Sequence, residues 1–210
     1  GGPCVSRAPR QIPVIDLLYQ TYLQREDAAR FVADVSSHYT LATLRRLLIA
    51  GGRVTRRAAA LALGFLGDIS VNAALGRALH DEDRGVRLIA EQAIQELWFR
   101  DGTQQQQELL RSVTRLNECS RFREAARQAG RLIDTGDSLA EAWNQRAIAY
   151  FQLHRYSESL RDCRQALRHN PFHFGAVLGM GHCYLEMEDG VAALRCLRRA
   201  LRVNPNMENV

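Results

Sequence analysis

The last third of the chain repeats its apolar and polar positions with a period of 34 residues. A shift by this period superposes Tyr150 on Tyr184, Leu160 on Leu194, Ala166 on Ala200, Leu167 on Leu201, and Asn170-Pro171 on Asn204-Pro205. A period of this length is typical of helix–turn–helix repeats. We therefore predict two consecutive helix pairs, over residues 140–173 and 174–207.

A weaker copy of the same pattern precedes these two pairs, over residues 106–139. One period separates Phe122 from Tyr156, Glu124 from Glu158, Leu132 from Ala166, and Ile133 from Leu167. Gly136-Asp137 stands at the turn where the later copies carry Asn-Pro. With this copy the C-terminal half, residues 104–210, has three repeats, which is the usual minimum for a stable helical array.

A second period, of 31 residues, organises the N-terminal half. It superposes Leu44 on Leu75, Leu48 on Leu79, Arg56 on Arg87, Ala59 on Ala90, and Leu63 on Ile94. Small and apolar residues at helical spacing predict further helix pairs over residues 13–103. We predict an all-α fold, a right-handed α-α superhelix whose two arrays meet near residue 103 and share one continuous core. The Pro- and Arg-containing residues 1–12 are predicted to be a disordered lead-in.

The C-terminal pattern resembles the tetratricopeptide repeat. The first clear copy matches that repeat at Trp143, Tyr150, Tyr156, Ala166 and Pro171, and the second at Gly181, Tyr184, Ala193, Ala200 and Pro205. The chain departs from the pattern at Ser159, Cys163, Val177 and Gly190. The resemblance implies a solenoid whose first helices line a concave groove that binds a peptide or a helix of another protein.

The N-terminal pattern resembles short HEAT-like repeats of bacterial proteins, in the segments Arg57–Gly64 and Asp83–Arg87. This resemblance implies that Arg56 and Arg87 pair with aspartates of neighbouring repeats, such as Asp68, Asp81 or Asp83. Two other interpretations remain open at this point: a strip that binds phosphates or acids, and a solvated face.

Counting around the predicted helices gives candidate residues for the concave groove. They are Arg111, Thr114 and Asn117 in the first repeat, Asn144, Gln145, Ile148 and Gln152 in the second, and Leu178, His182 and Glu186 in the third. Amide side chains suit a peptide backbone because each offers a donor and an acceptor. The first helix of the last repeat is also rich in glycine, at Gly175, Gly179 and Gly181. These glycines indicate either close approach of another backbone or close packing on the preceding repeat.

Composition adds one alternative function. The net charge of +5 and pI of about 9.2 come from arginine, since the chain has no lysine. Arginine suits phosphates and carboxylates, so a less favoured hypothesis is nucleic-acid binding through Arg46, Arg53, Arg56, Arg57 and Arg84. A second alternative is an enzyme accessory subunit or a lyase-like HEAT-repeat protein, which would need a bound chromophore or cofactor.

No catalytic or metal-binding pattern emerges from the sequence. His169, His173, His182 and Cys183 do not have the spacing of a zinc site. The five cysteines form no C-x-x-C pair, and an odd number argues against a disulfide framework. We predict a non-enzymatic protein without a cofactor, in a reducing and preferably cytoplasmic compartment. Export stays open because the chain does not begin with Met, and no apolar run is long enough to span a membrane.

The last helix is less polar than its equivalent one repeat earlier. Ser159 corresponds to Ala193, Asp162 to Cys196, and His169 to Val203. A terminal repeat normally presents a polar outer face to water. We therefore predict that Ala193, Leu197, Val203 or their neighbours are covered by another subunit, a partner protein or further sequence.

Overall fold

The structure, a computed structural model, describes residues 12–136 and 139–207. These residues form an all-α helical-repeat superhelix without a strand. The N-terminal half contains α1 (Val14–Arg25), α2 (Ala28–His38), α3 (Leu41–Ala50), α4 (Arg53–Leu66), a short 3₁₀ helix (Ile69–Val71), α5 (Asn72–Ala78) and α6 (Arg84–Arg100). The C-terminal half contains α7 (Gln104–Glu118), α8 (Phe122–Ile133), α9 (Ala140–Gln152), α10 (Tyr156–His169), α11 (Phe174–Glu186) and α12 (Gly190–Val203).

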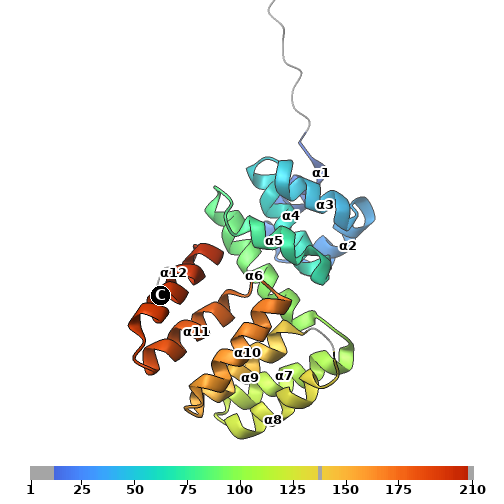
Figure 1. The fold of residues 1–210 in the computed structure, drawn as a ribbon. Helices are drawn as coiled ribbons and strands as arrows, with labels where there is room; N and C mark the ends of the chain where they lie inside the picture. Colours follow the sequence, from blue (N-terminus) through green and yellow to red (C-terminus); the bar gives the residue numbers. More distant parts are fainter. Residues whose placement is uncertain (1–11, 137–138, 208–210) are drawn as a thin grey trace, which may run out of the picture.

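The helices follow one another as antiparallel pairs, and Figure 1 shows the pairs stacking along a curved path. The C-terminal pairs α7–α8, α9–α10 and α11–α12 lie at the residues where the 34-residue period predicted them. The division of the chain into a HEAT-like and a tetratricopeptide array stays a prediction. The proposed lead-in falls, except for its last residue, outside the described residues.

Side-chain caps fix where several helices begin. Thr40, Asp83 and Asp189 each accept a hydrogen bond from a backbone N–H of the first turn of α3, α6 and α12. Thr103 and Gln106 form a reciprocal capping box at the start of α7. Such caps satisfy amides that have no partner within the helix. They also explain why α6 and α7 are separate helices although only three residues lie between them.

The turn inside each C-terminal pair has the same backbone geometry. Ser120, His154 and Glu188, each one period apart, are left-handed with φ of 58°, 58° and 60°. The next N–H donates to a carbonyl five residues earlier in all three turns, from Arg121, Arg155 and Asp189. This is the Schellman end of a helix. The degenerate first copy therefore forms the same turn as the two clear copies.

The buried apolar residues among those described form four clusters, and the largest contains residues of both halves. The largest cluster fills the N-terminal half, with residues such as Leu44, Leu63 and Ile94. Three smaller clusters lie between the C-terminal pairs. Phe174, at the start of α11, is the C-terminal residue that is buried within the N-terminal cluster.

The C-terminal repeats curve back onto the N-terminal half. In Figure 1 the end of α12 returns to the side of α5 and α6. Glu91 on α6 accepts hydrogen bonds from the side chains of Asn204 and Asn206, at 2.8 and 3.0 Å. The Phe172 ring lies so close to Gly76 on α5 that a Cβ there would collide with it. The two halves therefore meet at the last turns of the chain as well as at the α6–α7 junction.

Candidate functional site

A cavity of about 270 Å³ opens between α9 and α11. It is lined by Asn144, Ala147, Ile148, Phe151, Gln152, Ser159, Gly175, Leu178, Gly179 and His182. Five of the ten predicted groove residues are thus brought together: Asn144, Ile148, Gln152, Leu178 and His182. Spacing explains this, because Asn144, Ile148 and Gln152 follow one another at intervals of four on one face of a helix.

The other five predicted groove residues lie outside this cavity. Gln145 is buried and donates to Glu141 at 2.8 Å. Glu186 accepts a hydrogen bond from the Tyr156 hydroxyl at 3.1 Å. On α7, Asn117 donates to the Gln145 side chain and carbonyl, Thr114 bonds within its own helix, and Arg111 is exposed. These residues hold helices together or face solvent. On α7, Asn117 is engaged with Gln145 of α9.

The three glycines of α11 have different surroundings. A Cβ on Gly181 would come within 2.8 Å of Leu197, so this glycine permits close packing of α11 on α12. A Cβ on Gly179 would lie 3.3 Å from the Cys163 sulfur of the preceding repeat. Gly175 has only ordinary contact distances, at 3.6 Å from the His173 ring. Gly175 and Gly179 give the cavity its depth, because no side chain from these positions occupies it.

Sequence reasoning missed Phe151 and Ser159 as lining residues. Phe151 lies three positions after Ile148, and this helical spacing could have identified it. Ser159 comes from α10, and its hydroxyl donates to the Ala147 carbonyl at 2.8 Å. A contribution from another helix has no local signal in the sequence.

A buried polar network lies behind the cavity, where the two halves of the chain meet. The Glu141 carboxylate accepts hydrogen bonds from Asn144 at 3.1 Å, Gln145 at 2.8 Å and His173 Nε2 at 2.8 Å. His173 Nδ1 in turn accepts from the Ala176 backbone N–H at 3.1 Å. The ring is therefore the tautomer that carries its proton on Nε2. None of these contacts is suggested by the sequence, in which His173 lies in a turn.

This network continues into the N-terminal half through Trp98. Its indole ring stacks on His173, with centroids 4.2 Å apart and planes 16° from parallel. The indole N–H donates to Asn72 at 2.8 Å, and Asn72 donates to Asn170 at 2.9 Å. Trp98, Glu141 and Asn170 also line a pocket of about 440 Å³ where the two halves meet. The contacts of the network position the repeats relative to the N-terminal half.

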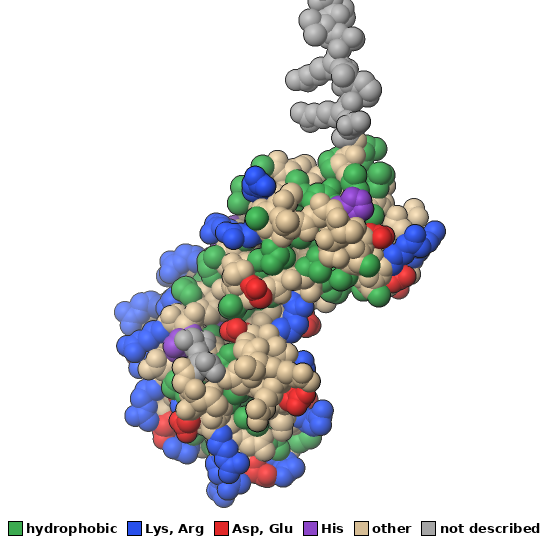
Figure 2. Space-filling model, turned by 90° about the vertical axis from the view of Figure 1, so that its right-hand side faces the viewer, with side chains coloured by type: hydrophobic (Ala, Val, Ile, Leu, Met, Phe, Trp, Pro, Cys, Tyr) green, Lys and Arg blue, Asp and Glu red, His purple; other side chains and the backbone are tan. Residues whose placement is uncertain are grey.

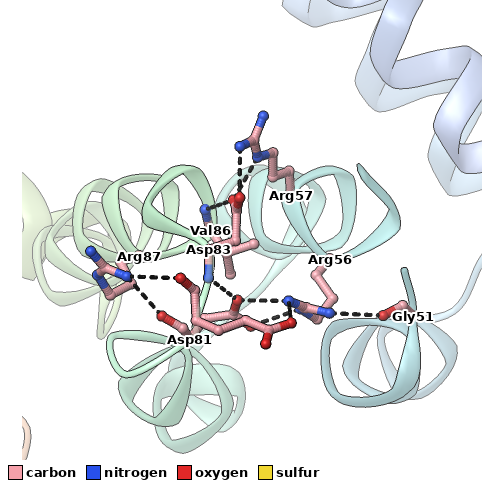
Figure 3. Close-up of polar contacts among 8 residues, drawn as sticks. Gly51, Arg56, Arg57, Asp81, Asp83, Val86 and Arg87 are labelled. Carbon is pink, nitrogen blue, oxygen red and sulfur yellow. Dashed lines mark hydrogen bonds and ion pairs between the residues drawn. The ribbon is translucent and has the colours of Figure 1, made fainter. Parts of the chain in front are cut away.

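Two of the five arginines considered for phosphate binding are engaged in ion pairs. Figure 3 shows Arg56 donating to Asp81 through two nitrogens, at 2.8 and 2.9 Å, and Arg57 donating to Asp83 at 2.6 and 2.8 Å. Arg87 donates to the carbonyls of Asp81 and Glu82. The expected pairing with aspartates therefore occurs at Arg56, whereas Arg87 binds backbone oxygens.

Arg46, Arg53 and Arg84 are exposed. Nucleic-acid binding through the five arginines stays a prediction.

The Arg57–Asp83 pair makes part of the stability depend on pH. The hydrogen bond from Arg57 lowers the pKa of the Asp83 carboxyl to about 2. In the unfolded chain an aspartate titrates near pH 4 (about 3.9). Stability from this pair is thus present above about pH 4, and it is lost as the pH falls toward 2, because the unfolded chain binds the proton first.

We expect the Arg57→Gln substitution to lower the free energy of unfolding by roughly 1 kcal/mol at pH 7, since Arg57 is partly screened by solvent. Urea unfolding at pH 7 and pH 3 measures this difference, which should shrink at pH 3. Arg30→Gln is the control, because the Arg30–Asp34 pair is exposed and 3.7 Å long. If Arg57→Gln lowers the free energy of unfolding equally at pH 7 and pH 3, Arg57 is not the cause of the lowered Asp83 pKa.

The buried cysteines Cys163 and Cys183 have the properties of structural thiols. Burial raises the pKa of the Cys163 thiol to about 12, and burial also raises the pKa of Cys183. A nucleophilic cysteine needs a lowered pKa and access to solvent. Among the described residues no group of three or more His, Cys, Asp or Glu side chains could hold a metal ion.

Of the three residues predicted to be covered by another chain, Ala193 is buried within this chain, whereas Leu197 and Val203 are half-buried. Ala193 is only 1% exposed. Leu197 packs on Gly181, and Val203 packs against the N-terminal core. The return of α12 to the N-terminal half covers part of this surface, and coverage of α12 by another chain stays a prediction. The exposed apolar residues of α12 are instead Val191, Leu194 and Leu201.

Comparison with known families identifies one of the repeats. Residues 140–173, which form α9 and α10, match the model of the tetratricopeptide repeat. This segment is a tetratricopeptide repeat. The match has the boundaries that the 34-residue period predicted, and a tetratricopeptide repeat supports a general role in protein–protein interaction.

Two solved structures are similar to the chain as a whole. MamA from Desulfovibrio magneticus RS-1, residues 41 to the end, is 13% identical with a TM-score of 0.44, over 93% of this chain and 96% of that chain. A MamA RS-1 ArsTM double mutant is 13% identical with a TM-score of 0.45, over 94% of this chain and 96% of that chain. In the part of the chain that the structure describes, no helix is long and apolar enough to cross a membrane.

Proposed function

We propose that the chain is a non-catalytic adaptor that holds a peptide or a helix of another protein between α9 and α11. The observation that carries this proposal is the cavity whose floor contains Gly175 and Gly179. A glycine inside a helix costs up to about 1 kcal/mol relative to alanine. No close neighbour of Gly175 excludes a side chain at this position, so the glycine leaves a space that a ligand can occupy.

The chemistry of the cavity suits a peptide with an apolar side chain. Ile148 is 38% exposed at its edge, and Leu178 is half-buried. Gln152 and His182 are exposed around these apolar groups, and both can hydrogen-bond a peptide backbone. The volume of about 270 Å³ is slightly below the roughly 300–1,000 Å³ that is usual for drug-sized ligands. It therefore suits one or two side chains of a longer segment.

Filling the cavity tests this function. Peptides are first selected from a random displayed library on the wild-type protein, and their affinities are then measured by fluorescence anisotropy. We expect Gly175→Leu and Ile148→Glu each to weaken binding by about tenfold or more, since loss of one buried apolar contact is worth on the order of 1.5–3 kcal/mol.

Each variant has a matched control. Gly190→Leu adds the same side chain near the start of α12, where nothing lies within 4 Å of the new Cβ. Leu88→Glu places a charge at an apolar position of α6 that is 45% exposed. Both controls should bind as the wild type does. Selected peptides that bind Gly175→Leu and Ile148→Glu with unchanged affinity would refute the proposal.

A further inference from the structure

A second pocket, of about 520 Å³, lies on the opposite side of α9 from the cavity described above. Three of its arginines, Arg123, Arg127 and Arg131, come from α8, and α9 contributes Arg146 and Tyr150. Successive helix residues are about 100° apart around the axis. Arg146 and Tyr150 therefore face away from Asn144 and Ile148, and a ligand can occupy either pocket without contacting the other.

The arginines of α8 form a stripe, beside which Glu124 and Asp134 are the nearby acids. Arg123, Arg127 and Arg131 are spaced by four residues, which puts them on one face of the helix, and all three are exposed. Within residues 12–136 and 139–207 none of them makes an ion pair. Like charges at this spacing destabilise a helix. The stripe therefore opposes the stability of the isolated protein and favours an anionic ligand.

The other two arginines of the pocket, Arg146 and Arg155, are already held in place. Arg146 donates to Asp162 at 2.7 and 2.9 Å, and Arg155 donates to Glu158 at 2.8 and 3.0 Å. Asp134 is the acidic residue among those that line the pocket. The unbalanced positive charge is thus located on the α8 stripe, and Arg146 and Arg155 form a fixed wall beside it.

The contacts of Tyr150 favour a ligand that carries carboxylates over a single-stranded nucleic acid. Arg146 lies 5.7 Å and Arg155 4.5 Å from the centre of its ring. Single-stranded nucleic acids bind by stacking bases on aromatic rings. Tyr150, already in contact with two guanidinium groups, is poorly placed for stacking. The pocket therefore favours an anion recognised through its charge and spacing, with carboxylates as the partners.

We propose that this pocket binds an acidic segment of another protein in extended conformation, with carboxylates at alternate positions. Four residues of a helix advance about 6 Å. Two residues of an extended chain advance about 6.6–6.8 Å, and alternate side chains point to the same side. Acidic side chains at every second position therefore match Arg123, Arg127 and Arg131, each of which can hold a carboxylate with two nitrogens.

Arginine recurs at the same place in the later repeats. Arg127, Arg161 and Arg195 are one period apart on α8, α10 and α12, and all are exposed. The helix α12 has no acidic residue between Gly190 and Val203. Figure 2 shows blue arginine side chains gathered along one edge of the C-terminal half. This positive face would attract an acidic segment over a longer range before it reaches the pocket.

The experiment measures fluorescence anisotropy of a short labelled peptide with three glutamates at alternate positions and serine elsewhere. The full chain should bind it, more weakly as salt increases. The triple variant Arg123→Gln, Arg127→Gln and Arg131→Gln should bind at least about tenfold more weakly. Glutamine is a good helix former, so the variant should keep its helical circular dichroism.

A second triple variant controls for the loss of charge. Arg25→Gln, Arg45→Gln and Arg77→Gln remove three exposed arginines of the N-terminal half. It should bind the peptide as the wild type does, and so should Gly175→Leu, in which only the first cavity is filled. Equal weakening in the two triple variants would overturn the proposal by showing a general charge effect.

Two further probes test the spacing and the class of ligand. A peptide of the same composition with its three glutamates adjacent should bind several-fold more weakly than the alternating peptide. Equal binding of the two peptides would overturn the proposed match to the α8 stripe. Tighter binding of a single-stranded oligonucleotide of equal charge would overturn the assignment to an acidic protein segment.

Discussion

Replacing Trp98 with alanine is expected to lower the free energy of unfolding by about 3–5 kcal/mol. The Trp98 side chain is 4% exposed, stacks on His173 and contacts the Phe174 ring at 5.2 Å. Its removal would leave a cavity at the place where the two halves of the chain meet. It would also remove the hydrogen bond from the indole to Asn72.

The shape of the unfolding curve should change as well. In helical-repeat proteins stability is the sum of the repeats and the interfaces between neighbours. Trp98 lies at an interface between residues far apart in the chain, so its loss should separate the unfolding of the C-terminal repeats from that of the N-terminal half. Urea unfolding followed by circular dichroism should show one transition for the wild type and two for the variant.

The second tryptophan of the chain provides the matched control. Trp143 is half-buried and lies against Arg146, with 4.8 Å from the guanidinium carbon to the ring centre. Trp143→Ala should therefore cost less than Trp98→Ala and leave a single transition. A cost below about 1 kcal/mol for Trp98→Ala would contradict the role given to this junction.

The substitution Glu141→Ala should also destabilise the protein, by about 3 kcal/mol or more, because each buried donor left without an acceptor costs about 1–3 kcal/mol. Glu141 is 4% exposed and accepts hydrogen bonds from Asn144, Gln145 and His173. Alanine would leave these three donors buried without their acceptor. The midpoint of urea unfolding measures the effect.

Glu158→Ala is the control for Glu141→Ala. Glu158 is an acid of the same repeat whose partner, Arg155, is half exposed at 51%. Exposed pairs of this kind contribute about 0–1 kcal/mol, so the control should change stability little. Similar effects of the two substitutions would show that the Glu141 network is not important for stability.

A double-mutant cycle connects the two predictions. Trp98 and Glu141 do not bond to each other, but both contact His173. Residues that share a partner usually show coupling energies of about 0.5–3 kcal/mol. We expect the double variant to lose less stability than the sum of the two single variants, because either change alone already disturbs His173.

Half of the candidate site could be predicted from the sequence. Asn144, Ile148 and Gln152 were identified because a helix brings every fourth residue to one face. Gln145 was predicted by the same reasoning but does not line the cavity, and its side chain bonds to Glu141 and Asn117. Helical spacing gives the direction of a side chain, and it does not say whether a neighbouring helix already occupies that direction.

The four-residue spacing of the arginines on α8 can be read from the sequence. Only the structure shows that, among the described residues, these arginines form no ion pair.

The sequence by itself determined the helices, their pairing and the position of the tetratricopeptide repeat. These features depend on local forces, in which each turn, cap and apolar stripe is specified by residues within one repeat. Only the tertiary structure decided that the last repeat closes onto the first half. The contacts responsible join residues 98 and 113 positions apart, from Asn72 to Asn170 and from Glu91 to Asn204. Asn170 and Asn204 are one period apart, but their partners Asn72 and Glu91 lie in the N-terminal half, outside the 34-residue repeats. These contacts therefore become evident only when the chain is folded.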